Sequence, residues 1–242
     1  IASYLRYFKQ LSSTAITLMA GYSYQQDQFE NLGIELGNFP NDELGYNALE
    51  TSADRLSGKA ALINIYCNLY PLNKLLAGFT RVNINYADVW SFNFSIRRET
   101  SNRLGENSMS GVFSSAATSV DLNKLWSMNF NALKARVSYG ITGAFPSQPS
   151  LSQDLFQYQL ENGGTVVQTR GANPDLKWEQ KRELNFGVDF GFGRVSGSVD
   201  FYQRNTKDII LGRYLSDVGY NQFVNSGALQ GRGFELSVQH QM

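Results

Sequence analysis

The chain has 242 residues, of which 42% are hydrophobic and 17% charged, and this composition is typical of a folded protein. Lys plus Arg equals Asp plus Glu at 21 each, so no basic excess is present to attract nucleic acid. Cys67 is the single cysteine, which excludes an internal disulfide. His240 is the single histidine, so the chain has no Cys/His spacing typical of a zinc site and little from which to build a histidine-based catalytic triad. The sequence therefore predicts no cofactor and no nucleic-acid partner.

The sequence was searched for two kinds of membrane-related segment, a transmembrane span and an export signal. No run of 18 apolar residues occurs, which excludes a transmembrane helix. A transmembrane β-barrel passes this test, because its strands need only ~9–11 residues and half of them are polar. The chain begins at Ile1 without a charged segment followed by an apolar run, so we expect that any export signal has been removed or lies upstream.

Along the chain, apolar residues recur at every second position, which is the period of a β-strand with one apolar face. In chain order the apolar rows are Ile16, Leu18, Ala20, Tyr22 and Tyr24; Trp90, Phe92, Phe94 and Ile96; Ala135, Val137, Tyr139 and Ile141; Leu184, Phe186, Val188, Phe190 and Phe192; Val195, Gly197, Val199 and Phe201; and Phe234, Leu236 and Val238. No helical period of comparable length appears. The pattern predicts roughly ten strands of ~8–13 residues, a length normal for membrane barrels.

The residues between the apolar rows are polar or small, and they define a second face. Around the turn at Gly193-Arg194 the polar positions that we single out are Glu183, Asn185, Asp189, Asp200, Tyr202 and Arg204. In a barrel these six residues are expected to face the lumen. Lumen-facing carboxylates are solvated or paired with Arg and Lys, so we interpret Glu183, Asp189 and Asp200 as non-catalytic and predict that the protein is not an enzyme.

The connections between the predicted strands fall into two kinds. Short turns are expected at Ala87-Asp88 and Gly193-Arg194, and long loops at residues 26–55, 100–111, 143–180 and 207–231. Short turns on one rim and long loops on the other are typical of outer-membrane barrels, whose periplasmic turns are short and extracellular loops long. Residues 56–67 break the alternation, and we interpret them as part of a loop hairpin rather than as a membrane span.

Aromatic and turn residues each have a structural and a functional interpretation. Trp90, Trp126 and Trp178, with Tyr66, Tyr70, Tyr139 and Tyr202, are expected either in interfacial girdles, which we favour, or stacked on sugar rings in the lumen. The stretch GANPD at residues 171–175 has the chemistry of a turn, because Asn before Pro is extended and Asp bonds backbone donors. We expect it to shape a loop rather than to contact a ligand.

Six motifs stand in a fixed order in this chain. They are GYSYQ (21–25), RVNINYADVWSFNFSIRRETSNRLGEN (81–107), KARVSYGITG (134–143), NPDLKWEQKRELNFGVDFGF (173–192), GRVSGSVDFYQRNTKDIIL (193–211) and GRGFELSV (231–238). In this order they resemble the SusC/RagA type of TonB-dependent outer-membrane transporter, over about three quarters of the chain. In that family the motifs lie in the second half of a large barrel.

The resemblance implies an all-β fold, an antiparallel transmembrane β-barrel portion of about ten strands from a larger barrel of 22 strands. It implies energised import of oligosaccharides or peptides across the outer membrane of a Gram-negative bacterium. The implied partners are outer-membrane lipid, TonB through a plug region, and a SusD-like surface lipoprotein. A whole barrel of this kind needs ~220 residues of strand alone. We therefore expect residues 1–242 to be a partial barrel domain that lacks the plug, the signal peptide and the terminal strands.

The chain also departs from the family pattern at two places. Residues 100–104 (TSNRL) replace a turn in which relatives carry a small residue, Ser and Arg-Phe, and residues 112–122 (VFSSAATSVDL) lack the tryptophan of a related strand. These departures weaken inferences about substrate more than those about fold. A passive porin or adhesin barrel and a soluble all-β carbohydrate-binding sandwich remain alternatives, because alternation alone does not separate them.

Overall fold

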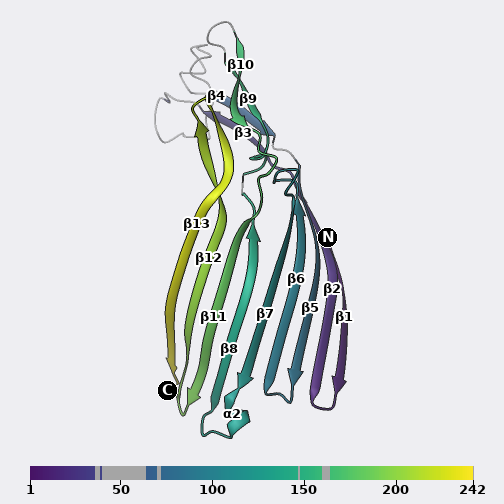
Figure 1. The fold of residues 1–242 in the computed structure, drawn as a ribbon, viewed down its shortest axis with the longest axis vertical. Helices are drawn as coiled ribbons and strands as arrows, with labels where there is room; N and C mark the ends of the chain where they lie inside the picture. Colours follow the sequence, from purple (N-terminus) through teal and green to yellow (C-terminus); the bar gives the residue numbers. More distant parts are fainter. Residues whose placement is uncertain (36–38, 40–63, 70–71, 147, 160–163, 242) are drawn as a thin grey trace. The chain divides into compact units, whose positions relative to one another are not determined.

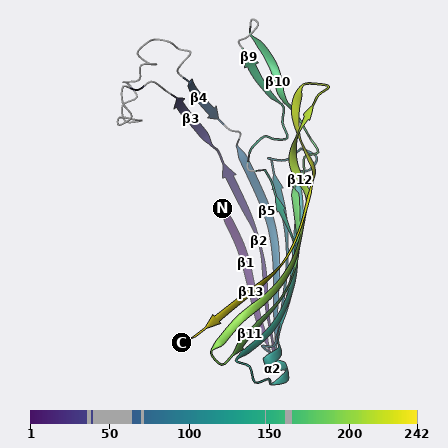
Figure 2. The same ribbon diagram turned by 90° about the vertical axis from the view of Figure 1, so that its left-hand side faces the viewer.

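A computed structural model of the chain describes residues 1–35, 39, 64–69, 72–146, 148–159 and 164–241. The chain divides into two compact units: unit 1 comprises Ile1–Gln26 and Asn73–Met242, and unit 2 comprises Asp27–Leu72. Unit 1 is built on a sheet of 11 strands in the order β1-β2-β5-β6-β7-β8-β11-β12-β13-β10-β9. Its long strands lie side by side in Figure 1, and Figure 2 shows them as one curved layer.

Nine strands of the sheet are long and two are short. The long ones are β1 (Ala2–Leu11), β2 (Thr14–Asp27), β5 (Asn73–Tyr86), β6 (Trp90–Ser101), β7 (Ser110–Asp121), β8 (Ala132–Ala144), β11 (Glu179–Phe192), β12 (Val195–Leu215) and β13 (Tyr220–His240), and the short ones are β9 (Leu155–Gln159) and β10 (Thr165–Gly171). The pairings of β1 with β2, of β9 with β10, and of successive neighbours from β5 through β8 and β11 to β13 are antiparallel, whereas β10 meets β13 in parallel over two residues. The predicted antiparallel all-β class is confirmed, and within unit 1 the described sheet is open rather than closed into a barrel.

Among the described residues, one short helix interrupts the strands. Helix α2 (Leu122–Trp126) lies in the connection between β7 and β8, and Asp121 caps its start by accepting a hydrogen bond from the Lys124 backbone N–H at 3.1 Å. Within the described part of the chain, no helix has the length and apolar character needed to cross a membrane.

The register of β5 to β8 and β11 to β13 gives the sheet two chemically different faces. We call the face that carries Phe94, Tyr139, Phe186 and Phe201 the apolar face, and the opposite face, which carries Arg136 and the six singled-out residues, the polar face. The apolar face is uncovered: Phe94 is 49% exposed, Phe186 48%, Phe234 66% and Leu236 62%. In the described residues of unit 1 no second sheet packs on this face, which argues against the sandwich alternative.

Two of the turns at one end of the sheet are short, as expected. Residues 87–89 join β5 to β6, where Ala87 and Asp88 have φ values of 52° and 54°, and Gly193 has φ 57° in the turn between β11 and β12. The connections at the other end are longer, with residues 102–109 between β6 and β7 and residues 145–178, including β9 and β10, between β8 and β11. The predicted contrast between short and long connections holds for these four. It fails for β7 and β8, which are joined at the short-turn end by residues 122–131, including α2, a longer connection than residues 102–109.

The prediction of a long loop at residues 207–231 was wrong. Strands β12 and β13 continue through this region to Leu215 and from Tyr220, so only residues 216–219 form the connection. Register shifts between Lys207 and Ile210, with Asp208 at φ 59°, break the simple alternation there. The two-residue period on which the prediction depended stops at this bulge, although the pairing resumes beyond it.

Unit 2 contains a two-stranded antiparallel sheet of β3 (Glu30–Glu35) and β4 (Asn64–Leu69). Residues 64–67 therefore lie in a separate hairpin between β2 and β5, in agreement with the loop interpretation of residues 56–67. Residues 56–63, and most of the expected loop at 26–55, lie outside the described residues.

The main buried cluster of unit 1 lies at the end of the sheet with the long connections. It consists of Leu104, Phe113 and Trp178, which are 2%, 8% and 3% exposed. The Trp178 ring meets the rings of Phe113 and Phe145 edge-on, each at 5.3 Å between centroids, and its Nε1 donates a hydrogen bond to the Met109 carbonyl at 3.1 Å. Trp178 is thus a core residue, and both interpretations offered for it, interfacial girdle and sugar stacking, are wrong.

The other aromatic residues differ in position. Trp126 is 60% exposed on α2, and Trp90 stacks on Phe92 at the short-turn end of β6 with 6.1 Å between ring centroids. Tyr139 lies on the apolar face and is 44% exposed. Tyr70 and the side chain of Tyr66 lie outside the described residues. Their assignment to interfacial girdles stays a prediction.

The segment 173–178 (NPDLKW) is hydrogen-bonded to the connection 102–109 on one side and to strand β13 on the other. Asn173 Oδ1 accepts a hydrogen bond from the Asp175 backbone N–H at 3.1 Å, which closes the turn that the sequence predicts. The Gly105 N–H donates to the Leu176 carbonyl at 2.8 Å, and Leu176 is fully buried. On the other side, Asn225 bonds the backbone N–H and carbonyl of Lys177 at 2.9 and 2.8 Å. The GANPD stretch therefore shapes a loop, as predicted.

Candidate functional site

The six singled-out polar residues come together because β11 pairs with β12 along 13 residue positions. The Cα partners are Glu183 with Arg204, Asn185 with Tyr202, and Gly187 with Asp200, while Asp189 lies opposite Ser198. Since side chains on one face alternate in both strands, all six lie on the polar face of one hairpin. The two-residue period was sufficient to place them on a common face.

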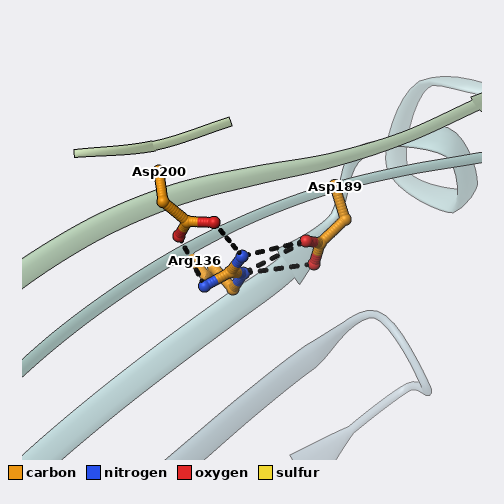
Figure 3. Close-up of polar contacts among 3 residues, drawn as sticks. All are labelled: Arg136, Asp189 and Asp200. Carbon is orange, nitrogen blue, oxygen red and sulfur yellow. Dashed lines mark hydrogen bonds and ion pairs between the residues drawn. The ribbon is translucent and has the colours of Figure 1, made fainter. Parts of the chain in front are cut away.

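Arg136 on β8 joins two of these carboxylates. Its guanidinium donates hydrogen bonds to Asp189, from Nη2 to Oδ1 at 3.0 Å and from Nε to both oxygens at 3.2 Å (Figure 3). Nη2 also donates to Asp200 Oδ2 at 2.9 Å, and Nη1 lies 2.8 Å from Asp200 Oδ1. One planar guanidinium thus pairs with carboxylates from two neighbouring strands.

Gly187 leaves the space in which this cluster forms. Gly187 is the Cα partner of both Arg136 on β8 and Asp200 on β12. A Cβ at Gly187 would lie 2.6 Å from Arg136 Cζ and 2.6 Å from Asp200 Oδ1. The absence of a side chain at this position therefore lets the guanidinium pass between the two aspartates.

A second charged group lies further along the same hairpin, away from the short turn. Glu183 accepts from Arg204 Nε at 2.9 Å and pairs with Lys181 Nζ at 2.9 Å. The Arg204 guanidinium lies 5.5 Å from the centre of the Tyr202 ring, in cation–π range. Tyr202 lies across from Gly233 on β13, where a Cβ would be 2.5 Å from the tyrosine hydroxyl. Asn185 lies between the two charged groups in the register.

The chemistry of this site is ionic pairing, with no arrangement typical of catalysis among the described residues. Asp189 and Asp200 both pair with Arg136, so neither is a carboxylate held apart as an acid or a base. In the same part of the chain, no group of three or more His, Cys, Asp or Glu side chains is arranged to hold a metal ion.

Sequence reasoning did not single out two members of the site, Arg136 and Lys181. Both residues lie at the alternate positions of their strands that carry polar side chains. The alternation of KARVSYG and KRELNFG in the sequence was sufficient to show this. What the alternation did not contain was the register between β8 and β11, which brings Arg136 beside residues 53 and 64 positions away in the chain.

The family model described as TonB dependent receptor-like, beta-barrel matches residues 3–241. TonB-dependent receptor P3 of Formosa agariphila is 31% identical over 255 residues, which cover 98% of this chain and 24% of that protein. TonB-dependent receptor SusC of Bacteroides thetaiotaomicron is 28% identical over 258 residues, covering 97% of this chain and 24% of that protein. The chain thus spans about a quarter of the length of these relatives.

Solved structures give the same picture. The structure of the RagAB peptide transporter matches with a TM-score of 0.79 and 25% identity, covering 100% of this chain and 27% of that chain. The RagAB peptide importer in the closed-closed state matches with a TM-score of 0.82 and 24% identity. The copper transporter OprC shares the fold with a TM-score of 0.58 at 14% identity.

Proposed function

The chain belongs to the β-barrel family of TonB-dependent receptors and is of the SusC/RagA type, and from this membership we propose that it forms part of the wall and the extracellular loops of an outer-membrane importer of oligosaccharides or peptides. Members of this family are transporters rather than enzymes. Import then consists of binding followed by movement of a plug, with no covalent chemistry on the substrate.

The observation that carries this proposal is the exposed apolar face of the sheet. Phe186, Phe201 and Phe234 lie in one row of Cα partners across β11, β12 and β13, and they are 48%, 42% and 66% exposed. A row of this kind is one of several on the same face, and soluble monomers rarely expose apolar patches beyond a few hundred Å². Contact with lipid removes this apolar surface from water. This explains why every second residue of these strands is apolar.

The polar face is then the lumen side of the wall. We assign Glu183, Asn185, Asp189, Asp200, Tyr202 and Arg204 to the lumen, together with Arg136 and Lys181. The ion pairs among them compensate the charges within the wall itself, so the hairpin presents a hydrated surface without a strong net field. Substrate and plug would pass along or rest against this surface.

The partners follow from the same proposal. TonB would act through a plug region outside residues 1–242, and a SusD-like surface lipoprotein would cover the end with the long connections. The RagAB structures are described as a peptide importer and transporter, which supports peptides as one substrate class. Oligosaccharides remain the other class through the resemblance to the SusC type.

A passive porin or an adhesin barrel is the alternative function, because the same wall serves without energy coupling. The discriminating observation is the sequence encoded upstream of residue 1 in the same gene. A plug domain preceded by a TonB-box-like segment supports the importer, and a barrel without a plug contradicts it.

Uptake measurements test the function directly. We expect that a strain deleted for the full-length receptor loses growth on particular glycans or peptides in a panel, and that the full-length gene restores it only when TonB is intact. Restored uptake in the absence of TonB would identify a passive pore instead, and unchanged growth of the deletion strain on every substrate of the panel would contradict a role in nutrient import.

A further inference from the structure

Ionised side chains are sorted by sign between the two faces of the sheet. We consider β5 to β8 and β11, with β12 up to Lys207 and β13 from Ala228, where the pairing is continuous. The polar face carries both signs: Arg81, Arg97, Lys134, Arg136, Lys181 and Arg204, and Glu99, Asp121, Glu179, Glu183, Asp189, Asp200 and Glu235. The apolar face of these described strands carries only cations: Lys74, Arg98, Arg182, Lys207 and Arg232.

The cations on the apolar face stand at its margin. On β6 the apolar row ends at Ile96 and Arg98 is the next residue on that face. On β11 Leu184 is followed by Arg182, and on β13 Phe234 is followed by Arg232. In each strand the cation therefore lies on the side of the apolar row that is away from the short turns. We call Arg98, Arg182 and Arg232 the basic margin.

The margin shifts from strand to strand in the way that tilted strands require. Ile141 on β8 pairs with Arg182, while Leu184 on β11 shares a row with Gln203 and Arg232, one step nearer the short turns. The other margin shifts in the same direction, because β11 continues past Phe190, the partner of Leu133, to Phe192. Since barrel strands tilt by ~35–45°, positions displaced in this direction lie at one membrane depth.

Within the continuously paired strands considered above, the basic margin has no anionic partner on its own face. Arg98, Arg182 and Arg232 are exposed, and the hydrogen bond that Arg182 makes is a 3.5 Å contact with Gln180 of the same strand. The nearest carboxylates in each strand point to the opposite face. A cation at the edge of an apolar surface keeps its stem on that surface and its charge in the polar layer.

We propose that the basic margin binds the phosphate groups of lipids in the outer leaflet of the outer membrane. The inference rests on the proposed function, which places the apolar face in lipid and the long connections outside. Arginine suits this ligand because its planar guanidinium pairs with two phosphate oxygens at once. In the continuously paired strands considered above, no carboxylate lies on the apolar face, so no negative charge there repels the phosphate.

Lipid binding by the purified full-length receptor tests the proposal. Native mass spectrometry would compare lipid A that carries phosphate with its dephosphorylated form, at two salt concentrations. We expect preference for the phosphorylated lipid, weakened by salt. Replacing each arginine by glutamine (R98Q, R182Q, R232Q) should lower this affinity about fivefold per residue, because a cation near an anionic lipid surface contributes about 1 kcal/mol. Replacement by lysine should retain most of it.

Arg81→Gln is the matched control, because Arg81 is an exposed cation of β5 on the polar face. It should leave lipid binding unchanged. A loss as large in R81Q as in the triple glutamine variant would overturn the proposal, as would displacement of the lipid by inorganic phosphate at equal phosphate concentration. Flotation with phosphatidylcholine vesicles distinguishes failure of the proposed function from failure of the lipid-phosphate inference. Failure of the wild type to insert contradicts the proposed function, whereas insertion without phosphate preference contradicts only this inference.

Discussion

Arg136 is the residue on which the polar cluster of β8, β11 and β12 depends. We expect Arg136→Ala in the full-length receptor to lower the free energy of unfolding by about 1–2 kcal/mol, because Asp189 and Asp200 then face each other without a cation. The side chains of Arg136 and Asp189 are 35% and 41% exposed, so solvent screens part of the effect. Denaturant unfolding in detergent measures the change, and Arg81→Ala, at an exposed position outside this cluster, should remain within about 0.5 kcal/mol of the wild type.

Gly187 supports a prediction that depends on space rather than on charge. Gly187→Ala places a Cβ 2.6 Å from both Arg136 Cζ and Asp200 Oδ1, so the ion pairs must shift. We expect a loss of about 1–3 kcal/mol in unfolding free energy. Gly231→Ala is the control, because a Cβ added at Gly231 on β13 would meet no atom of the described residues within 4 Å. Equal stability of the two variants in the same unfolding assay would refute the steric explanation.

At the residue scale, the sequence was sufficient to predict on which face of the sheet each polar residue lies, but not which residue it pairs with. The alternation placed Glu183, Asp189 and Asp200 on one side of a hairpin, and their pairing with Arg and Lys agrees with the expectation for lumen carboxylates. It did not identify Arg136 as the partner, because a two-residue period contains no register between strands separated by a long connection. Assignment of these residues to a lumen stays a prediction.

At the scale of elements, the 173–178 segment, which leads into β11, contacts the connection 102–109 and strand β13. Trp178→Ala removes two edge-on ring contacts and a hydrogen bond to Met109, so we expect a loss of about 3–5 kcal/mol. Limited proteolysis of the full-length receptor should then cleave residues 102–109 faster than in the wild type. Trp126→Ala, at a position 60% exposed, should leave both measurements nearly unchanged. Unaltered proteolysis of the Trp178 variant would show that the cluster does not hold these connections.

Prediction of elements succeeded where the period was regular and failed where it was not. Strands β6, β8 and β11 and the turns at 87–88 and 193–194 follow directly from alternation and turn chemistry. The parts of β12 and β13 beyond the bulge at Lys207 to Ile210 were missed because the bulge changes the phase of the pattern. Trp178 was misassigned because its burial comes from Phe113 and Phe145, which are distant in sequence.

At the scale of the whole molecule, the sheet of unit 1 leaves strand edges open. In the described sheet β1 has one neighbour, β2, and β13 meets β10 over only two residues on its outer side. Unpaired backbone groups in hydrocarbon cost several kcal/mol each. We expect residues 1–242 expressed alone to aggregate, as measured by sedimentation in detergent. A monomeric, heat-modifiable species on a gel would contradict this expectation.

The fold class was predictable from the sequence because its cause is local. Alternation in each strand, turn residues between strands and the lack of a helical period each point to an antiparallel sheet with one apolar face. Closure, strand number in the whole barrel and the position of unit 2 depend on contacts between distant segments. These features do not leave a periodic signal in residues 1–242.

The hairpin of β12 and β13 is longer than a membrane requires. Each strand has 21 residues, whereas a tilted strand crosses the hydrocarbon core with ~9–11. The surplus, beyond the bulge at Lys207 to Ile210, is already hydrogen-bonded from one strand to the other and to the 173–178 segment through Asn225. The conformational entropy of this segment is therefore lost during folding rather than on association. A protein or substrate that binds there contacts a preorganised surface, so less of the contact energy is spent on ordering the segment and more of it contributes to affinity.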